Sequence, residues 1–201
     1  MKNENTRRIT SEDVLSMETY GETRIKRRQN ITEVKRDRRV YIGPDAVFHF
    51  ENYETIFHQI HEMLWIEKGG EAQIHDELSA YNPLIPNGFE LVCTLMFEIE
   101  DPVRRAKTLG GLGGVEKTVF IAFDGGNKIF AQAEDDVDRT NAAGKASSVQ
   151  FLHFQFSETN IKSFKNPNVE VSIGIDHENY GHSAIISGKV RKALSEDFTL
   201  S

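Results

Sequence analysis

The sequence predicts an α+β fold in which a mostly antiparallel sheet of six or more strands is packed by helices. Short apolar or alternating runs bounded by glycine, proline and asparagine recur through the second half of the chain, which is typical of antiparallel strands. Helical periodicity dominates before residue 82, so we expect the helices to be concentrated in the N-terminal half. Phenylalanine is frequent, at 13 of 201 residues, and supplies large apolar units for one core, so residues 1–201 are expected to form a single domain.

Three segments are expected along this domain: a disordered tail at 1–8, N-terminal helices over 9–39 and an α+β core over 40–201. Thr10, with Asp13 three residues later, matches a capping box, which predicts a short helix from about Ser11. A basic helix is expected over 21–39. It carries few apolar residues, so it should lie on the surface with one thin apolar stripe facing inward.

A long helical stretch is expected from Asn52 to Tyr81. Gly69 and Gly70 lie in its middle, and two glycines cost about 2 kcal/mol inside a helix, so we expect a break there. Two short strands around the Gly43-Pro44 turn should precede it.

The remainder of the chain is expected to consist of strands joined by turns and short helices. Strands are expected at 89–99, in the KTVFIAFDGGNKIFAQAE hairpin, in SVQFLHFQF, in VEVSIGID and in HSAIIS. Short helices are expected after Asp101-Pro102, after Ser157 and from about Lys189.

Composition excludes several classes of protein. One cysteine, Cys93, cannot build a disulfide framework or a cysteine-based metal site, and its apolar surroundings predict a buried thiol. No run of about 18 apolar residues exists, so no membrane span is expected. Without an apolar N-terminal segment a cytoplasmic location is expected.

Two motifs resemble nucleotide-binding or catalytic signatures but lack an essential residue. In GGLGGVEKT, Glu116 occupies the place where a phosphate-binding loop needs glycine before Lys-Thr. In GHSAI, Ile185 replaces the second glycine of a nucleophile elbow. No catalytic residue and no cofactor are predicted from these motifs.

One face of the helix after Asn52 carries an unusual set of side chains. At 100° per residue, Glu54, His58, His61 and Trp65 lie together, opposite the apolar stripe. A solvated face seldom carries a tryptophan and two histidines. We therefore expect these four residues to form an interface, covered by another segment or by a partner subunit.

The next helix carries a carboxylate and an imidazole on its apolar face. Glu71 and His75 stand four residues apart on the same side as Ile74 and Leu78. Burial of both would require them to pair, so they are expected to form a structural pair.

A metal site is a weaker hypothesis for the histidines. His58, His61 and Glu62 read H-x-x-H-E, which differs from the H-E-x-x-H order of zinc proteases. The candidate metal ligands are His58 and Glu62 on the helix, with His153, His177 and His182 from the strands.

Charge is unevenly distributed along the chain. Residues 22–39 contain eight Lys and Arg against three Asp and Glu, although the net charge of the chain is −7. A surface for nucleic acid or for an acidic partner is one reading, and a solvated helix lying near the acidic remainder of the fold is the other. No base-stacking aromatic lies in this segment, so nucleic-acid binding ranks last.

Four long sequence segments resemble an uncharacterised bacterial family, catalogued as family 3501 of the domains of unknown function. The similarity extends over about residues 9–198 and rests on ENYETIFHQIHEMLWIEKGGEAQIHDELSAYNPLIPNG, LVCTLMFEIEDPVRRAKTLGGLGGVEKTVF, ASSVQFLHFQF and GIDHENYGH. The resemblance implies no assigned activity. It does imply a redox or peroxide-defence setting, because genes of the family often lie beside rubrerythrin-like and iron–sulfur oxidoreductase genes.

These observations favour a non-catalytic accessory or interaction protein with a rubrerythrin-like or iron–sulfur oxidoreductase partner. Self-association into a homo-oligomer is a second expectation for the interface. The first alternative is a metal-binding protein or metal-dependent enzyme, and the second is nucleic-acid binding through residues 22–39.

Overall fold

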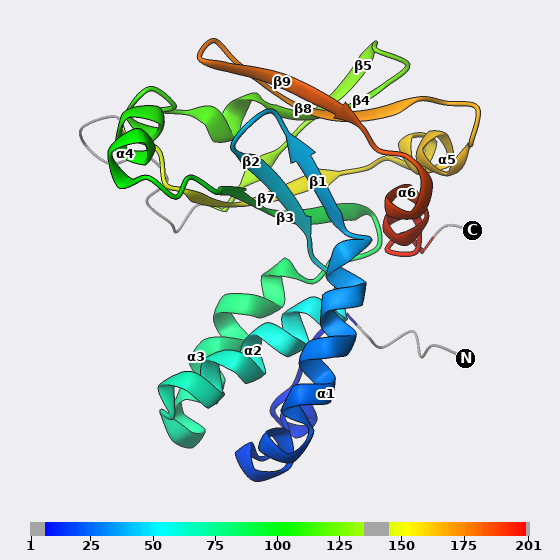
Figure 1. The fold of residues 1–201 in the computed structure, drawn as a ribbon. Coiled ribbons are helices and arrows are strands. Elements are labelled where there is room, and N and C mark those ends of the chain that lie inside the picture. The colour runs from blue at the N-terminus through cyan, green and yellow to red at the C-terminus, as the bar shows by residue number, and fades with distance from the viewer. Residues whose placement is uncertain (1–6, 135–144, 200–201) are drawn as a thin grey trace.

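The computed structural model describes residues 7–134 and 145–199 and confirms the α+β class. Within these two ranges, nine strands form two antiparallel sheets, which face each other across one core (Figure 1). The first sheet has the order β1 (Arg39–Ile42), β2 (Ala46–Phe50), β3 (Glu90–Phe97), β7 (Val149–Gln155) and β6 (Gln132–Ala133). The second has the order β5 (Asn127–Phe130), β4 (Val119–Phe123), β8 (Val171–His177) and β9 (Tyr180–Ile185).

Strand β3 is buried on both faces. Leu91, Cys93 and Leu95 point into the core between the sheets, whereas Val92 points the other way, into a second apolar cluster. This alternation follows from the two-residue period of a strand. Cys93 is fully buried, as expected, and burial raises the pKa of its thiol.

A single hydroxyl joins the two sheets where β1 and β9 approach each other. Tyr180 Oη donates to the carbonyl of Ile42 at 2.8 Å and accepts from the backbone N–H groups of Asp45 and Ala46, each at 2.9 Å. The β1–β2 turn is thereby held against β9, although β1 and β9 are not paired in a common sheet.

Three long helices form a separate lobe on the outer face of the first sheet. They are α1 (Met17–Arg36), α2 (Tyr53–Glu67) and α3 (Gly70–Tyr81). Figure 1 shows them projecting away from the sheets, and we call them the helical lobe. Their apolar cluster includes Ile56, Ile60 and Leu64, and it meets the sheet at Val92 and Phe151.

Short elements complete the fold. Helix α4 (Pro102–Gly110), α5 (Glu158–Lys165) and α6 (Gly188–Ser195) lie in the second half of the chain. Three 3-10 helices are η1 (Ser11–Asp13), η2 (Asn82–Leu84) and η3 (Val115–Thr118). Helices are therefore less concentrated in the N-terminal half than expected. They are spread along the chain, and of the α-helices only the three long ones lie before residue 82.

Several helix boundaries in the structure differ from those predicted. The basic helix begins at Met17 rather than residue 21, because the Ser16 side chain caps it by accepting from Thr19 N–H at 3.2 Å. The capping box at Thr10 is present, but it starts only one 3-10 turn. The predicted break at Gly69-Gly70 is confirmed, with Lys68 in the left-handed region.

The predicted disordered tail at 1–8 falls mostly outside the described residues. Arg7, which is described, donates to the carbonyl of Pro86 at 3.3 Å. Within the two described ranges, every helix is too short or too polar to cross a membrane.

Candidate functional site

Helix α1 covers the face of α2 that the sequence marked as an interface. His61, at its centre, is fully buried. Its Nε2 accepts from Leu15 N–H at 3.0 Å, and its Nδ1 lies 2.7 Å from the Phe57 carbonyl, to which it donates. Both ring nitrogens are therefore occupied within the chain, and burial lowers the pKa of His61. The cover over His61 comes from the chain itself, from Leu15 just before α1 and from the Tyr20 ring on α1, whose centroid lies 5.0 Å from that of His61.

A charged network fastens α1 to α2. Arg24 donates to both carboxylate oxygens of Glu62, each at 2.8 Å, and the Tyr20 hydroxyl donates to the same carboxylate at 2.7 Å. The Arg24 guanidinium, more than the Tyr20 hydroxyl, lowers the pKa of Glu62 to about 2. Burial, and then Glu62, raise the pKa of Tyr20. Glu62 is thus an ionised carboxylate held by two α1 side chains.

His58 lies at the edge of this network. Its Nδ1 is 3.4 Å from the Tyr20 hydroxyl, whose proton is already directed at Glu62. His58 must therefore supply the proton in that contact, which leaves its Nε2 free to accept. Burial lowers the pKa of His58, so the ring is neutral at neutral pH.

Trp65 and Glu54 mark the two ends of the same face. A Cβ atom at Gly21 would lie 2.8 Å from the Trp65 ring, so only glycine permits this approach of α1 to α2. The Arg24 guanidinium lies 5.5 Å from the Trp65 ring centroid. Glu54 is exposed at the other end. The four predicted interface residues thus share a helix face but not one environment.

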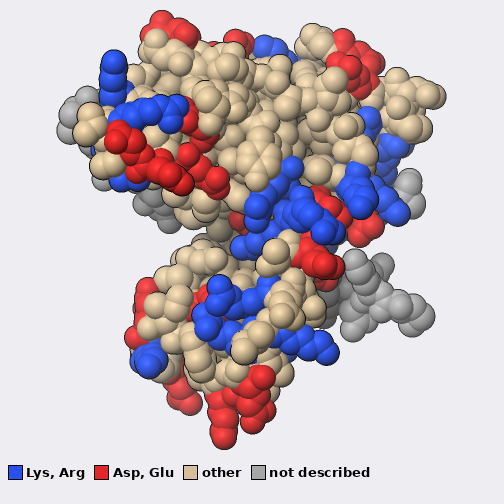
Figure 2. Space-filling view, in the orientation of Figure 1, with Lys and Arg blue, Asp and Glu red and all other residues tan. Residues whose placement is uncertain are grey.

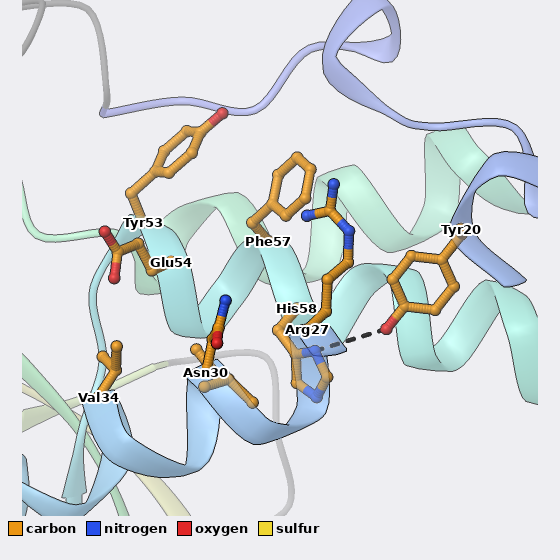
Figure 3. Close-up of a pocket in the computed structure, with 9 residues that line it drawn as sticks. Tyr20, Arg27, Asn30, Val34, Tyr53, Glu54, Phe57 and His58 are labelled. Carbon is orange, nitrogen blue, oxygen red and sulfur yellow. Dashed lines mark hydrogen bonds between the residues drawn. The ribbon is translucent and has the colours of Figure 1, made fainter. Parts of the chain in front are cut away.

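A pocket of about 500 Å³ opens between α1 and α2, beside His58. Figure 3 shows the side chains around it, with the Tyr53 and Phe57 rings on α2 and the Arg27 guanidinium reaching across from α1. We call it the α1–α2 pocket, and its lining residues are Tyr20, Arg27, Asn30, Ile31, Val34, Tyr53, Glu54, Phe57 and His58.

A second hollow, of about 590 Å³, lies at the far end of the helical lobe. Its walls come from the segment before α1, the end of α2 and the start of α3. We call it the tip groove, and it is lined by Val14, Leu15, Ser16, Met17, Leu64, Trp65, Lys68, Gly70, Glu71 and Ile74. Apolar side chains dominate this lining, in contrast to the mixed lining of the α1–α2 pocket.

The predicted structural pair of Glu71 and His75 is wrong. Both residues are exposed, and the His75 side chain, 90% exposed, has Asp76 as its neighbour, with Nδ1 and a carboxylate oxygen 3.7 Å apart. Helix α3 turns Ile74 and Leu78 toward the apolar cluster, and His75 lies about 100° away from Ile74 around the helix. Water solvates both side chains, so Glu71 and His75 do not need the pairing that burial would have required.

The five candidate metal ligands do not assemble. Among residues 7–134 and 145–199, no group of three or more His, Cys, Asp or Glu side chains has a metal-binding arrangement. His58 and Glu62 lie in the helical lobe, whereas His153, His177 and His182 lie on strands β7, β8 and β9. A metal site would need these five side chains close together, and the structure places them in two separate parts of the fold.

Each of the three candidate ligands on β7, β8 and β9 makes local contacts. His153 lies between two carboxylates, with Nδ1 3.1 Å from Glu90 and Nε2 3.5 Å from Glu134; burial alone would lower its pKa, but the carboxylates raise it. His177 accepts from Asn179 N–H through Nδ1 and contacts the Gly113 carbonyl through Nε2.

His182 packs against the β1–β2 turn. A Cβ atom on Gly43 would lie 2.6 Å from its ring, and Gly43 has a φ of 61°. The ring also lies 4.8 Å from that of Tyr180. These contacts give His182 a packing role at the junction of the two sheets.

Part of the basic segment is neutralised within the fold. Arg24 pairs with Glu62, and the buried Arg38 pairs with Asp197 after α6. Lys26, Arg28 and Arg36 remain exposed. Figure 2 shows Lys and Arg on the helical lobe and at its junction with the sheets, interspersed with acidic residues. A continuous basic surface of the kind that nucleic acid requires is not seen on this face.

The sequence predicted only a thin apolar stripe on the basic helix and missed the polar residues of α1 on the same face, Tyr20, Arg24 and Arg27. Tyr20, Arg24, Arg27, Ile31 and Val34 recur at spacings of four, three, four and three, the period of a helix face that packs on another helix. Arginines and a tyrosine occupy three of these five positions, so a search for apolar residues alone found only Ile31 and Val34. The full stripe becomes visible when the aliphatic parts of the arginines and the ring of the tyrosine are counted as packing surface.

Fold and site together define an α+β protein with a two-sheet body and a projecting helical lobe that carries a pocket and a groove. The sequence matches the family model described as Protein of unknown function (DUF3501) over residues 8–198, and the chain belongs to this family. A solved structure, described as a novel protein of unknown function from Burkholderia pseudomallei K96243, is similar, with 36% identity and a TM-score of 0.86. The similarity covers 94% of this chain and 98% of that one. No curated protein matches the sequence.

Proposed function

We propose that this protein is a non-catalytic accessory protein whose helical lobe docks a partner protein at the tip groove. The apolar lining of that groove is the observation that carries the proposal. Side chains of Met17, Trp65 and Ile74 border it without being fully buried. Apolar surface left in a concave site at the end of a projecting lobe is typical of a protein-binding site.

The charges around the groove favour a basic partner segment. Glu71 lines the groove, and Glu18 and Glu67 are exposed on the turns beside it; Lys68 is the cation of the lining. Figure 2 shows acidic residues gathered at the far end of the helical lobe. A partner segment that presents apolar side chains flanked by Lys or Arg would complement both features.

A non-catalytic role agrees with the chemistry of the described residues. Cys93 is fully buried with a raised thiol pKa, which makes it a poor nucleophile. Both ring nitrogens of His61 are engaged in hydrogen bonds within the chain, and the Tyr20 hydroxyl is hydrogen-bonded to Glu62. The family resemblance suggests a rubrerythrin-like or iron–sulfur oxidoreductase protein as the partner, in a redox or peroxide-defence setting.

The test uses the full chain and the purified rubrerythrin-like and iron–sulfur oxidoreductase proteins of the same organism. A photo-crosslinking amino acid at position 74 should capture one of them, whereas the same probe at Val103, which is 77% exposed on α4, should not. Ile74→Glu should then weaken binding by at least about tenfold, and Val103→Glu should leave it unchanged.

Glu71→Lys provides a variant that leaves packing intact, because Glu71 is exposed. It should weaken binding of a basic segment, and the loss should shrink as salt rises. Binding of both proteins that is unaffected by Ile74→Glu and Glu71→Lys, or no binding of either, would contradict the proposal.

A further inference from the structure

The α1–α2 pocket contains a cation, Arg27, that forms no ion pair with any residue in the described ranges. We propose that this pocket binds a small organic monoanion that carries a planar ring, such as an aryl carboxylate. This site is separate from the tip groove: the two hollows have no lining residue in common.

Arg27 would bind the anionic group. Its Nε donates to Thr23 Oγ1 at 2.9 Å, which fixes the plane of the guanidinium and leaves four N–H donors. Among the described residues Arg27 has no ion pair, in contrast to Arg24, whose guanidinium is held by both oxygens of Glu62. A half-buried guanidinium that is oriented but not neutralised suits a carboxylate, which can accept two parallel hydrogen bonds.

Two aromatic rings form the apolar wall beside that cation. The Tyr53 and Phe57 rings lie on one side of α2 with centroids 5.9 Å apart and an interplanar angle of 23°. Ile31 and Val34 face them from α1. The Arg27 guanidinium carbon lies 5.9 Å from the centroid of the Phe57 ring. A ligand could therefore place its carboxylate on Arg27 while its ring packs on Phe57. A volume of about 500 Å³ is enough for such a ligand.

The remaining polar groups limit the ligand's charge and polarity. Glu54 lines the pocket beside Tyr53 and would repel a second anionic group. His58 offers an unprotonated Nε2, which accepts a hydrogen bond from a hydroxyl or N–H of the ligand. A monoanion with one donor group therefore fits better than a dianion or a phosphate.

The walls of the pocket are fixed before any ligand arrives. Tyr20 is fully buried, and the bonds of Glu62 to Tyr20 and Arg24 hold α1 at one distance from α2. The close contact of Gly21 with Trp65 does the same one turn away. A preformed site loses less conformational entropy on binding than one that must close around its ligand.

The experiment measures binding of benzoate, 4-hydroxybenzoate and indole-3-acetate to the full chain by NMR titration and calorimetry. We expect saturable binding with one ligand per chain, and perturbation of the Arg27 Nε–H signal. Arg27→Gln should weaken binding at least about tenfold. Arg28→Gln is the matched control, because Arg28 is an exposed neighbour outside the pocket, and it should bind as the wild type does.

Two further arms test the charge and the ring. Benzamide, which lacks the charge, and acetate, which lacks the ring, should each bind at least about tenfold more weakly than benzoate. Phthalate, a dianion, should bind more weakly than benzoate, and Glu54→Gln should reduce that difference. Thermal melts confirm that each variant is folded. The proposal is overturned if folded protein binds none of the three aryl carboxylates, if benzamide equals benzoate, or if Arg27→Gln and Arg28→Gln behave alike.

Discussion

Glu62 is the residue on which the α1–α2 contact depends. Its carboxylate accepts from the Tyr20 hydroxyl and from two nitrogens of Arg24, and its neighbour His58 completes the group. The sequence indicated Glu62 and His58 as metal ligands because residue types alone do not reveal their partners. In the tertiary structure Arg24 is the partner of Glu62, and its fork of N–H donors satisfies both carboxylate oxygens.

Glu62→Gln should lower the free energy of unfolding by about 1.5–3 kcal/mol at neutral pH, because hydrogen bonds to a charged group are lost. The pKa of Glu62 falls from 4.5 to about 2 on folding, so its stabilisation is full above pH 4.5 and is lost as pH falls toward 2. The difference between wild type and variant, measured by urea unfolding, should therefore shrink over that range. A difference independent of pH would show that Glu62 does not act as an ionised partner.

At the scale of elements, the junction of α2 and α3 contains two residues with positive φ, one just after α2 and one at the first position of α3. Lys68 has a φ of 55° and Gly70 a φ of 72°. The predicted break at the glycine pair is confirmed, but Lys68 rather than Gly69 has the left-handed conformation that ends α2. A glycine at Lys68 would match the usual end of a helix, where this conformation carries no Cβ penalty.

Two substitutions at this junction should have opposite effects. Lys68→Gly should raise the free energy of unfolding by about 0.5–1 kcal/mol, because it removes a strained non-glycine residue. Gly70→Ala should lower it by about 1 kcal/mol, although a Cβ atom there meets nothing within 4 Å, because the cost lies in the backbone conformation. Thermal unfolding measures both, and changes of the same sign would contradict the assignment of strain.

At the scale of the whole molecule, two apolar clusters meet at the first sheet. The larger lies between the sheets, and the smaller joins the helical lobe to Val92 and Phe151. Arg38, at the foot of α1, provides a polar connection. It donates to the carbonyls of Phe50, Glu51 and Ala193 and pairs with Asp197. A buried ion pair of this kind is costly to disrupt, so it fixes the lobe to the body.

The helical lobe should open before the sheets, because its apolar cluster is smaller and its helices are exposed on several sides. Trp65, the single tryptophan, lies in this lobe and reports on it by fluorescence. In native-state hydrogen exchange, amides of α1–α3 should show lower opening free energies than those of β3, β4 and β8. Trp65 fluorescence should change at lower urea than the β-sheet signal, whereas coincident transitions would show one cooperative unit.

The sequence by itself determined most of the elements, although not all of their boundaries, because hydrophobic period, caps and glycine turns are local. The α+β class, the β4–β5 hairpin and the break before α3 all follow from residues close together in the chain. Only the tertiary structure decided what each helix face meets. It placed α1 over His61, exposed His75, divided the strands between two sheets and dispersed the five candidate metal ligands. The physical reason is that burial and charge pairing depend on segments distant in sequence, such as Arg24 and Glu62, whose approach no local pattern encodes.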